Sequence, residues 1–186
     1  VLSAAMPPSY VRSFARPARD VLTSLDLVRE RAPGAVVLVN TSGAFLTFYP
    51  PAIYEYHLGR PLDAYVLSSL WGRMTIERLD GRSFVLRTDR PGWLSNLFAR
   101  VARRTEELEP GRRQENGLFA ATLLELTPDR RDALAVRFDF PRGLDDPGVL
   151  FLRWDGERMV PLAAGALPAG TPVPLADTSD VWRSMM

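Results

Sequence analysis

Apolar and polar positions divide the chain into a short part with helical spacing and a longer part with strand spacing. Pro17 favours the first turn of a helix. Four apolar residues then recur on one face of this predicted helix, namely Val21, Leu22, Leu25 and Val28. Pro33-Gly34 predicts the end of the helix. The run 35–39 is short, apolar and rich in Val, which is typical of a buried strand.

A second helical segment is predicted over 44–58. Pro50-Pro51 either breaks it or begins a new helix, because proline removes a backbone donor and is disfavoured inside helices. Gly59 predicts its C-terminal end. The run 64–70 follows as a strand, so the order strand, helix, strand predicts one βα unit.

Asp80-Gly81 lies between two runs of strand residues and predicts a β-hairpin. A three-residue loop with Gly81 in the left-handed region pairs Ile76 with Phe84 and Met74 with Leu86. We favour this register because it keeps one face of the hairpin apolar.

A second hairpin is predicted at Asp155-Gly156, between 149–154 and 157–162. A three-residue loop there places Arg153 opposite Glu157 as a cross-strand ion pair. Both Gly81 and Gly156 are expected at positive φ, where a β-branched residue such as Val is poorly tolerated.

Four further segments complete the pattern. An amphipathic helix is predicted over 93–104 and a charged, exposed, mobile loop over 106–117. The apolar run 118–126 is typical of a central strand, and the alternation over 134–140 is typical of a half-buried one. The prediction is an α+β fold, in which a βα unit precedes a mainly antiparallel sheet that closes into a sandwich or partial barrel.

The expected domain organisation has three parts. Residues 1–16 form an N-terminal segment that we expect to be juxtamembrane, because an apolar, proline-terminated start before an amphipathic helix is typical of the exit from a membrane. Residues 17–162 form a single α+β domain, since no linker separates the βα part from the strands. Residues 163–186 are rich in Ala, Pro and Gly and are expected to form an irregular tail.

Composition excludes several kinds of chemistry. The 186 residues are 46% apolar and 24% charged, which is typical of a soluble globular chain, and no stretch approaches the ~20 apolar residues of a membrane span. A net charge of +1 provides no general attraction for nucleic acid. Cysteine and lysine are both absent, which excludes thiol catalysis, thiolate metal sites and lysine nucleophiles. With a single His and no carboxylates at ligand spacing, we expect no metal and no organic cofactor.

The one histidine, His57, is the first candidate for a general base. Glu55 lies two positions away, which on a helix is a different face, and no Gly-x-Ser-x-Gly nucleophile turn occurs. Carboxylates brought together by folding, for example Asp139 and Asp155, remain a possibility that sequence does not reveal. Asp145-Asp146 is interpreted as a turn before a strand rather than a calcium loop.

The best candidate for a small-ligand site is the turn Asn40, Thr41, Ser42 and Gly43, between a strand and a helix. Backbone N–H groups at such a helix start bind anions. The simpler interpretation is that Thr41 or Ser42 caps the helix.

Five arginines form the other candidate surface, which would contact anionic lipid or phosphate: Arg100, Arg103, Arg104, Arg112 and Arg113. Interleaved Glu residues cancel part of their charge.

Several segments together resemble a known group of proteins. These are the run 36–40, then Arg60-Pro61-Leu62, the segment 141–147 and the segment 151–156. The chain resembles, over most of 30–162, the soluble C-terminal region of large, uncharacterised multi-pass bacterial membrane proteins. The resemblance implies a membrane-tethered domain of unknown function and carries no site residue. Arg12, Arg16 and Arg19 would then be juxtamembrane, which favours the cytoplasmic side.

Three functional hypotheses follow. The first is a non-catalytic interaction or sensory domain tethered to a bacterial membrane protein, with a protein partner that is either its own membrane region or another subunit. The second is a small-ligand-binding or hydrolytic domain that uses the Asn40 to Gly43 turn. The third is a peripheral binder of anionic lipid. The first is preferred because the sequence lacks the residues that the chemistry of the others requires.

Overall fold

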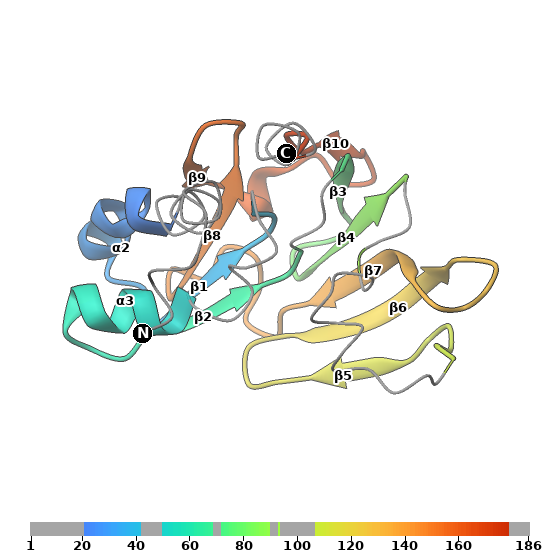
Figure 1. Ribbon diagram of the computed structural model, residues 1–186, viewed down its shortest axis with the longest axis horizontal. Helices are drawn as coiled ribbons and strands as arrows, with labels where there is room; N and C mark the ends of the chain where they lie inside the picture. The colour runs from blue at the N-terminus through green and yellow to red at the C-terminus, as the bar shows by residue number, and fades with distance from the viewer. Residues whose placement is uncertain (1–20, 42–49, 69–71, 90–92, 94–106, 179–186) are drawn as a thin grey trace, which may run out of the picture.

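The residues that the structure describes form two β-sheets and two α-helices (Figure 1). The computed structural model describes residues 21–41, 50–68, 72–89, 93 and 107–178. The smaller sheet is mixed and has the strand order β2-β1-β8-β9. Its strands are β1 (Ala35–Leu38), β2 (Asp63–Val66), β8 (Val149–Trp154) and β9 (Met159–Pro161). The two helices are α2 (Leu25–Arg31) and α3 (Pro50–Leu58).

The larger sheet has six antiparallel strands in the order β10-β3-β4-β7-β6-β5. They are β3 (Met74–Arg78), β4 (Ser83–Thr88), β5 (Arg113–Glu115), β6 (Ala120–Leu126), β7 (Ala133–Asp139) and β10 (Val173–Pro174). The α+β class is confirmed. Neither sheet formed by the described residues closes into a barrel, so the partial-barrel alternative is wrong.

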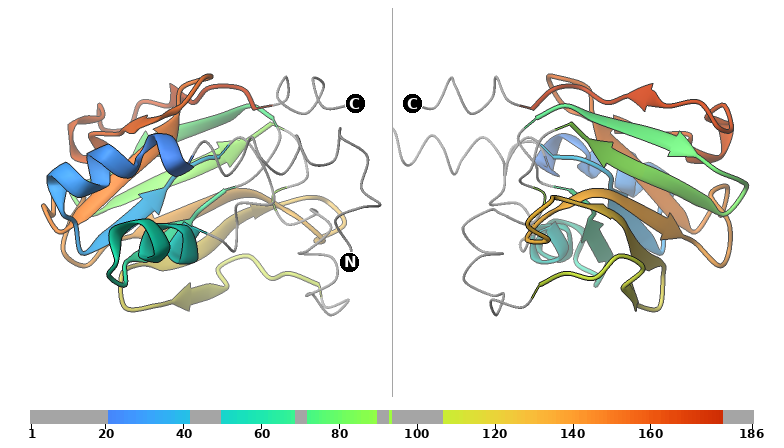
Figure 2. Two further views of the ribbon diagram at one scale, coloured as in Figure 1. Left: turned by 60° about the vertical axis from the view of Figure 1, so that its left-hand side comes forward. Right: turned by 90° about the vertical axis from the view of Figure 1, so that its right-hand side faces the viewer.

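The small sheet is buried on both faces. Alternate side chains of a strand point to opposite sides, so one strand contributes to a core on each face. In β1, Val36 and Leu38 pack with residues of α2 and α3 in one core. Val37 packs with Phe151 of β8 and with the inner face of the large sheet in a second core. The order of layers is therefore helices, small sheet, large sheet (Figure 2).

Aromatic rings fill the core between the two sheets. The ring of Phe84 lies 5.6 Å from that of Phe140 and 6.3 Å from that of Phe151 on β8. Phe138 lies 5.7 Å from Phe84 on the neighbouring strand. Fully burying such a side chain contributes about 1.5–3 kcal/mol, so this cluster is a main contact between the sheets.

The βα unit is confirmed. β1 and β2 are parallel, with Ala35 opposite Asp63, and α3 connects them. α3 begins at Pro50, as expected from a residue that favours the first helical turn. It ends before Gly59, whose φ of 66° is left-handed. The part of this prediction over 44–49 lies outside the described residues.

The buried face of the first helical segment is confirmed except at one position. Val21, Leu25 and Val28 are buried, but Leu22 is 39% exposed. Residues 21, 25 and 28 share one helical face, whereas residue 22 is turned about 100° from residue 21.

The first hairpin has the expected loop length but a different register. Leu79 and Ser83 close a loop of three residues, and Ile76 pairs with Leu86 rather than with Phe84. The shift is two residues, so the same side chains stay on the apolar face. Gly81 is not at positive φ, which corrects that prediction. The carboxylate of Asp80 shapes the turn instead, because it accepts the N–H of Arg82 at 2.7 Å.

The second hairpin is longer than expected. Trp154 pairs with Met159, so Arg153 lies opposite Val160 and its predicted pairing with Glu157 is wrong. Asp155 Oδ1 accepts the N–H groups of both residues 157 and 158, which requires a wider turn. Gly156 has φ of 113°, as predicted.

Two regions expected to be irregular contain strands. The segment expected as a loop over 106–117 contains β5, an edge strand that pairs with β6. The segment 163–178 contains β10, which pairs with β3, and the turn Ala164–Ala166. β6 lies between two strands but is half exposed rather than fully buried, because only its inner face meets the core.

Several expectations lie outside the described residues. They concern the segment 1–16, most of the predicted helix over 93–104 and the end of the chain over 179–186. None of the helices in the described ranges is long and apolar enough to cross a bilayer.

We expect Gly156→Ala to lower the free energy of unfolding by about 1–3 kcal/mol, because an L side chain at φ of 113° is strained. Gly81→Ala is the matched control. A methyl group there meets no atom within 4 Å and the backbone is not left-handed, so the change should stay within about 0.5 kcal/mol. Urea unfolding measures both, and equal losses at the two glycines would contradict this assignment.

Candidate functional site

An open concave surface with charged side chains lies on the outer face of the large sheet. It is an open groove of about 760 Å³ beside the β3–β4 turn. Three arginines and two aspartates line it together with short polar and apolar residues: Asp80, Gly81, Arg82, Arg113, Thr122, Leu124, Arg137, Asp139, Phe140 and Pro141. The groove thus combines side chains from β5, β6 and β7 with the β3–β4 turn.

Strand geometry brings its charged side chains together. Arg137 and Asp139 are two apart on β7 and therefore share a face. Thr122 of β6 pairs with Arg137 on one side and with Arg113 on the other. Its small side chain leaves room for the two guanidinium groups to approach the same carboxylate.

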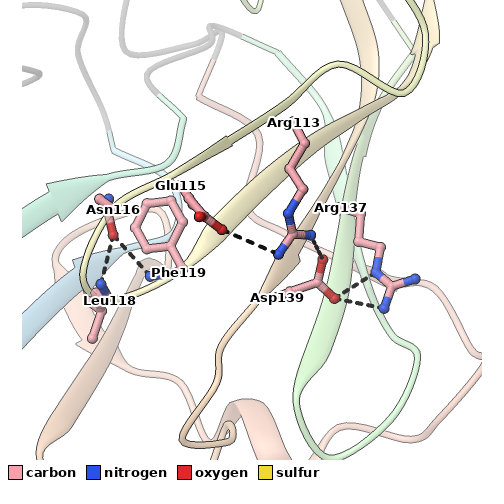
Figure 3. A network of polar contacts seen from close by, with 7 residues as sticks. All are labelled: Arg113, Glu115, Asn116, Leu118, Phe119, Arg137 and Asp139. Carbon is pink, nitrogen blue, oxygen red and sulfur yellow. Dashed lines mark hydrogen bonds and ion pairs between the residues drawn. The ribbon is translucent and has the colours of Figure 1, made fainter.

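Asp139 is the centre of this network (Figure 3). Arg137 contacts Asp139 Oδ1 through Nε at 2.8 Å and Nη2 at 2.7 Å. Arg113 Nη1 lies 3.3 Å from Asp139 Oδ2, and its Nη2 lies 3.8 Å from Glu115 on the same strand. Two arginines thus share one aspartate, and Glu115 supplies a second negative charge, so the network as a whole is balanced.

A second ion network covers the neighbouring part of the outer face. Arg87 lies 4.0 Å from Glu77 on β3 and hydrogen-bonds Glu125 on β6. The alanine Ala135 of β7 is paired with both Arg87 and Glu125. Because its side chain is small, Arg87 reaches across β7 to the far strand.

The remaining aspartate of the groove is occupied by its own turn. The N–H of Arg82 donates to Asp80 and lowers the pKa of that carboxyl below its usual range. Among the described residues no ion pair involves Arg82, whose side chain is exposed. Arg82 is therefore the cation of the groove with the most capacity to bind an anion.

The strand end at Asn40 is held by hydrogen bonds inside the protein. Asn40 is 2% exposed, and its Oδ1 accepts the N–H of Trp154 at 3.0 Å. The N–H of Thr41 donates to the carbonyl of Ser68 at 3.2 Å. These contacts tie the end of β1 to β8 and to the residues after β2. Ser42 and Gly43 lie outside the described residues, so neither the predicted anion site nor the helix cap is tested.

The other sequence candidates are spread over the molecule. His57 is exposed in the last turn of α3, with its ring against Tyr56 at 5.1 Å. Asp146 lies in a turn before β8, as predicted, and accepts the N–H of Gly148 at 2.8 Å. Arg112 is exposed, whereas Arg100, Arg103 and Arg104 lie outside the described residues.

The described residues bring no three His, Asp or Glu side chains together as metal ligands. Two further carboxyls have shifted pKa values. Hydrogen bonds from the hydroxyl of Thr127 to Asp129, and from the backbone of Arg158 to Asp155, lower the pKa of each aspartate. Both are turn residues stabilised in their charged form, which suits structural hydrogen bonding rather than proton donation.

A buried hydroxyl pair joins the two helices. Ser24 donates to the carbonyl of Val21 at 2.6 Å, so its hydroxyl accepts from that of Tyr54 at 2.7 Å. Burial raises the pKa of Tyr54 to about 12.

Comparison with known proteins adds no identity. No family model, no curated protein and no solved structure matches this chain. The resemblance to bacterial membrane proteins therefore stays a prediction.

Sequence reasoning missed most of the groove. Arg137 was interpreted only as part of a half-buried strand, Asp139 was named only as a possible partner of Asp155, and Arg82 was not singled out. One available pattern was overlooked, because Asn116-Gly117 is a common hairpin turn. Asn116 indeed accepts the N–H groups of residues 118 and 119 and closes the β5–β6 hairpin (Figure 3).

We expect Asn40→Ala to lower the free energy of unfolding by about 1–3 kcal/mol, because it leaves the buried N–H of Trp154 without its acceptor. Chemical denaturation measures the loss. Gln114→Ala removes an exposed amide and is the control. An Asn40→Ala protein as stable as the control would contradict the structural role.

Tyr54 gives a pH dependence. Its pKa is about 12 in the folded chain and about 10 when unfolded. Because the unfolded chain ionises first, the folded state keeps the full contribution of Tyr54 to stability below about pH 10. The free energy of unfolding then falls as the pH rises towards 12, by about 1.4 kcal/mol at about pH 11. Tyr54→Phe should remove this part of the alkaline loss in urea unfolding, whereas Tyr56→Phe, at an 84% exposed position, should not. If both variants lose the same free energy of unfolding at alkaline pH, the assignment of this loss to Tyr54 is contradicted.

Proposed function

We propose that this chain is a non-catalytic interaction domain that binds an acidic segment of a partner protein in the groove on the outer face of the large sheet. We further propose, from the resemblance, that it is tethered to a bacterial membrane protein, where the partner is that protein's own membrane region or another subunit. The observation that carries the proposal is Arg82, an exposed guanidinium group in the groove that forms no ion pair with any described residue.

The charges support an acidic ligand. The groove contains three arginines and two aspartates. One aspartate is held by two arginines, and the other accepts backbone hydrogen bonds in its own turn. Arg82 therefore keeps donors for an incoming carboxylate, and guanidinium groups bind carboxylates in a planar, two-point geometry.

The shape of the groove supports a polypeptide ligand. It is open to solvent along its length, and Leu124, which is 37% exposed, gives it an apolar contact. Small-molecule sites are usually more enclosed and mostly apolar. An extended segment with acidic side chains fits an open, charged surface better.

The two alternatives have weaker support. The oxygen of Asn40, proposed for a ligand or hydrolytic site, already accepts a backbone N–H inside the protein. Of the arginines proposed to bind anionic lipid, Arg113 is engaged by Asp139. A site for an acidic segment requires none of these contacts in the groove to break.

A short fluorescein-labelled peptide of alternating Glu and Ser tests the proposal by fluorescence anisotropy. We expect binding that weakens as ionic strength rises from about 0.01 M to about 1 M. Arg82→Glu should weaken binding about tenfold, because it reverses the charge at the groove arginine that forms no ion pair with the described part of the chain.

Arg158→Glu, in the β8–β9 turn outside the groove, is the matched charge reversal and should bind as the original chain does. A peptide with Lys in place of Glu should not bind. The proposal fails if both peptides bind alike, or if Arg82→Glu and Arg158→Glu have the same effect.

A further inference from the structure

The outer edge of β5 carries backbone groups that its own sheet does not use. β5 is the last strand of the large sheet, and all three of its residues are exposed. The carbonyl of Arg112 accepts the N–H of Leu123, and the N–H of Asn116 donates to the carbonyl of Phe119, so these two positions face β6. Strand alternation then points the N–H and C=O groups of Arg113 and Glu115 away from the sheet. No strand in the described part of the chain pairs with them.

We propose that β5 pairs antiparallel with β5 of a second copy of this chain, about a two-fold axis at Gln114. This axis places Arg113 of each copy opposite Glu115 of the other. Both positions have outward backbone groups, so each pair forms two hydrogen bonds. The two Gln114 residues face each other as a non-hydrogen-bonded pair. The two large sheets thereby become one continuous sheet with a closed, symmetric contact.

The side chains fit the same register. Arg113 and Glu115 are two apart, so they project from the same face, where they lie 3.8 Å from each other (Figure 3). In the paired edges each therefore meets an opposite charge directly across the strand, which is a stabilising pair. A guanidinium has five donors, so Arg113 keeps its contact with Asp139 while it meets the partner's carboxylate.

Shifted registers are disfavoured by charge. An axis at Arg113 places the two arginines opposite each other, and an axis at Glu115 does the same for the two glutamates. Like charges directly opposite are destabilising. Short, charged edge strands generally prevent indiscriminate pairing, and here the alternation of sign leaves one matched register with a second copy.

A second copy fits this edge better than an acidic peptide does. A strand with acidic residues at successive same-face positions would oppose Glu115 while it matched Arg113. Three residues a side form a small contact, of the class found in transient interfaces that bury less than about 1,200 Å². The inference goes beyond the proposed function, because binding in the groove at Arg82 does not need the second copy.

Sedimentation velocity of the whole chain, from about 10 μM to about 1 mM, tests the pairing. The sedimentation coefficient should rise with concentration. Arg113→Glu alone and Glu115→Arg alone should each weaken association at least tenfold, because each places like charges opposite each other. An equimolar mixture of these two variants should associate again, since every cross-strand pair is then of opposite sign.

Arg158→Glu and Glu157→Arg, in the turn of the other sheet, are the matched controls, and both should associate as the original chain does. Arg113 and Glu115 are 52% and 74% exposed, so the variants should keep the original circular dichroism spectrum. If neither variant associates by itself but their mixture does, misfolding of the variants cannot explain the loss. A chain that stays monomeric to about 1 mM, or a mixture that associates no better than its components, overturns the proposal. Loss of association in Glu115→Arg with groove binding retained would leave the proposed function standing, because Glu115 does not line the groove.

Discussion

Burial of the small sheet on both faces is the constraint on which the other parts of the structure depend. Val36, Val37, Leu38 and Val39 have no exposed surface, although successive residues point in opposite directions. β1 therefore needs one apolar layer on each side, which the helices and the large sheet supply. Among the faces of the two described sheets, the outer face of the large sheet is the one left exposed to carry charge, and the groove lies there.

Ion networks, rather than apolar side chains, cover that outer face. Arg87 spans from β3 to β6, and Asp139 joins Arg137 to Arg113. Exposed ion pairs of this kind contribute little to stability, about 0–1 kcal/mol each. They give the outer face a charged rather than an apolar surface. The proposed acidic-segment groove and the proposed pairing of β5 both use this arrangement, one through the face and the other through the edge.

Particular residues show how far sequence reasoning reached. The βα unit and both hairpins were predicted, because the apolar runs and the Asp-Gly pairs act locally. The conformation of Gly81 was missed because the carboxylate of Asp80 holds the turn without a left-handed glycine. β5 was missed because its residues are all polar, and apolar alternation, the pattern used to find strands, does not exist there. The hydrogen bond from the backbone N–H of Trp154 to the side-chain oxygen of Asn40 joins positions far apart in sequence, and no local pattern predicts it.

The sequence by itself determined the class of most segments and the face that each presents to the core, since periodicity records which side chains must avoid water. It also determined that thiol and lysine chemistry are absent. Only the tertiary structure decided which strands are neighbours, and therefore that Arg113 and Arg137, 24 positions apart by their numbers (137 − 113), share Asp139 across β6. The physical reason is that strand pairing joins residues through backbone hydrogen bonds, which every residue offers alike. The order of strands in a sheet thus follows from how the layers pack.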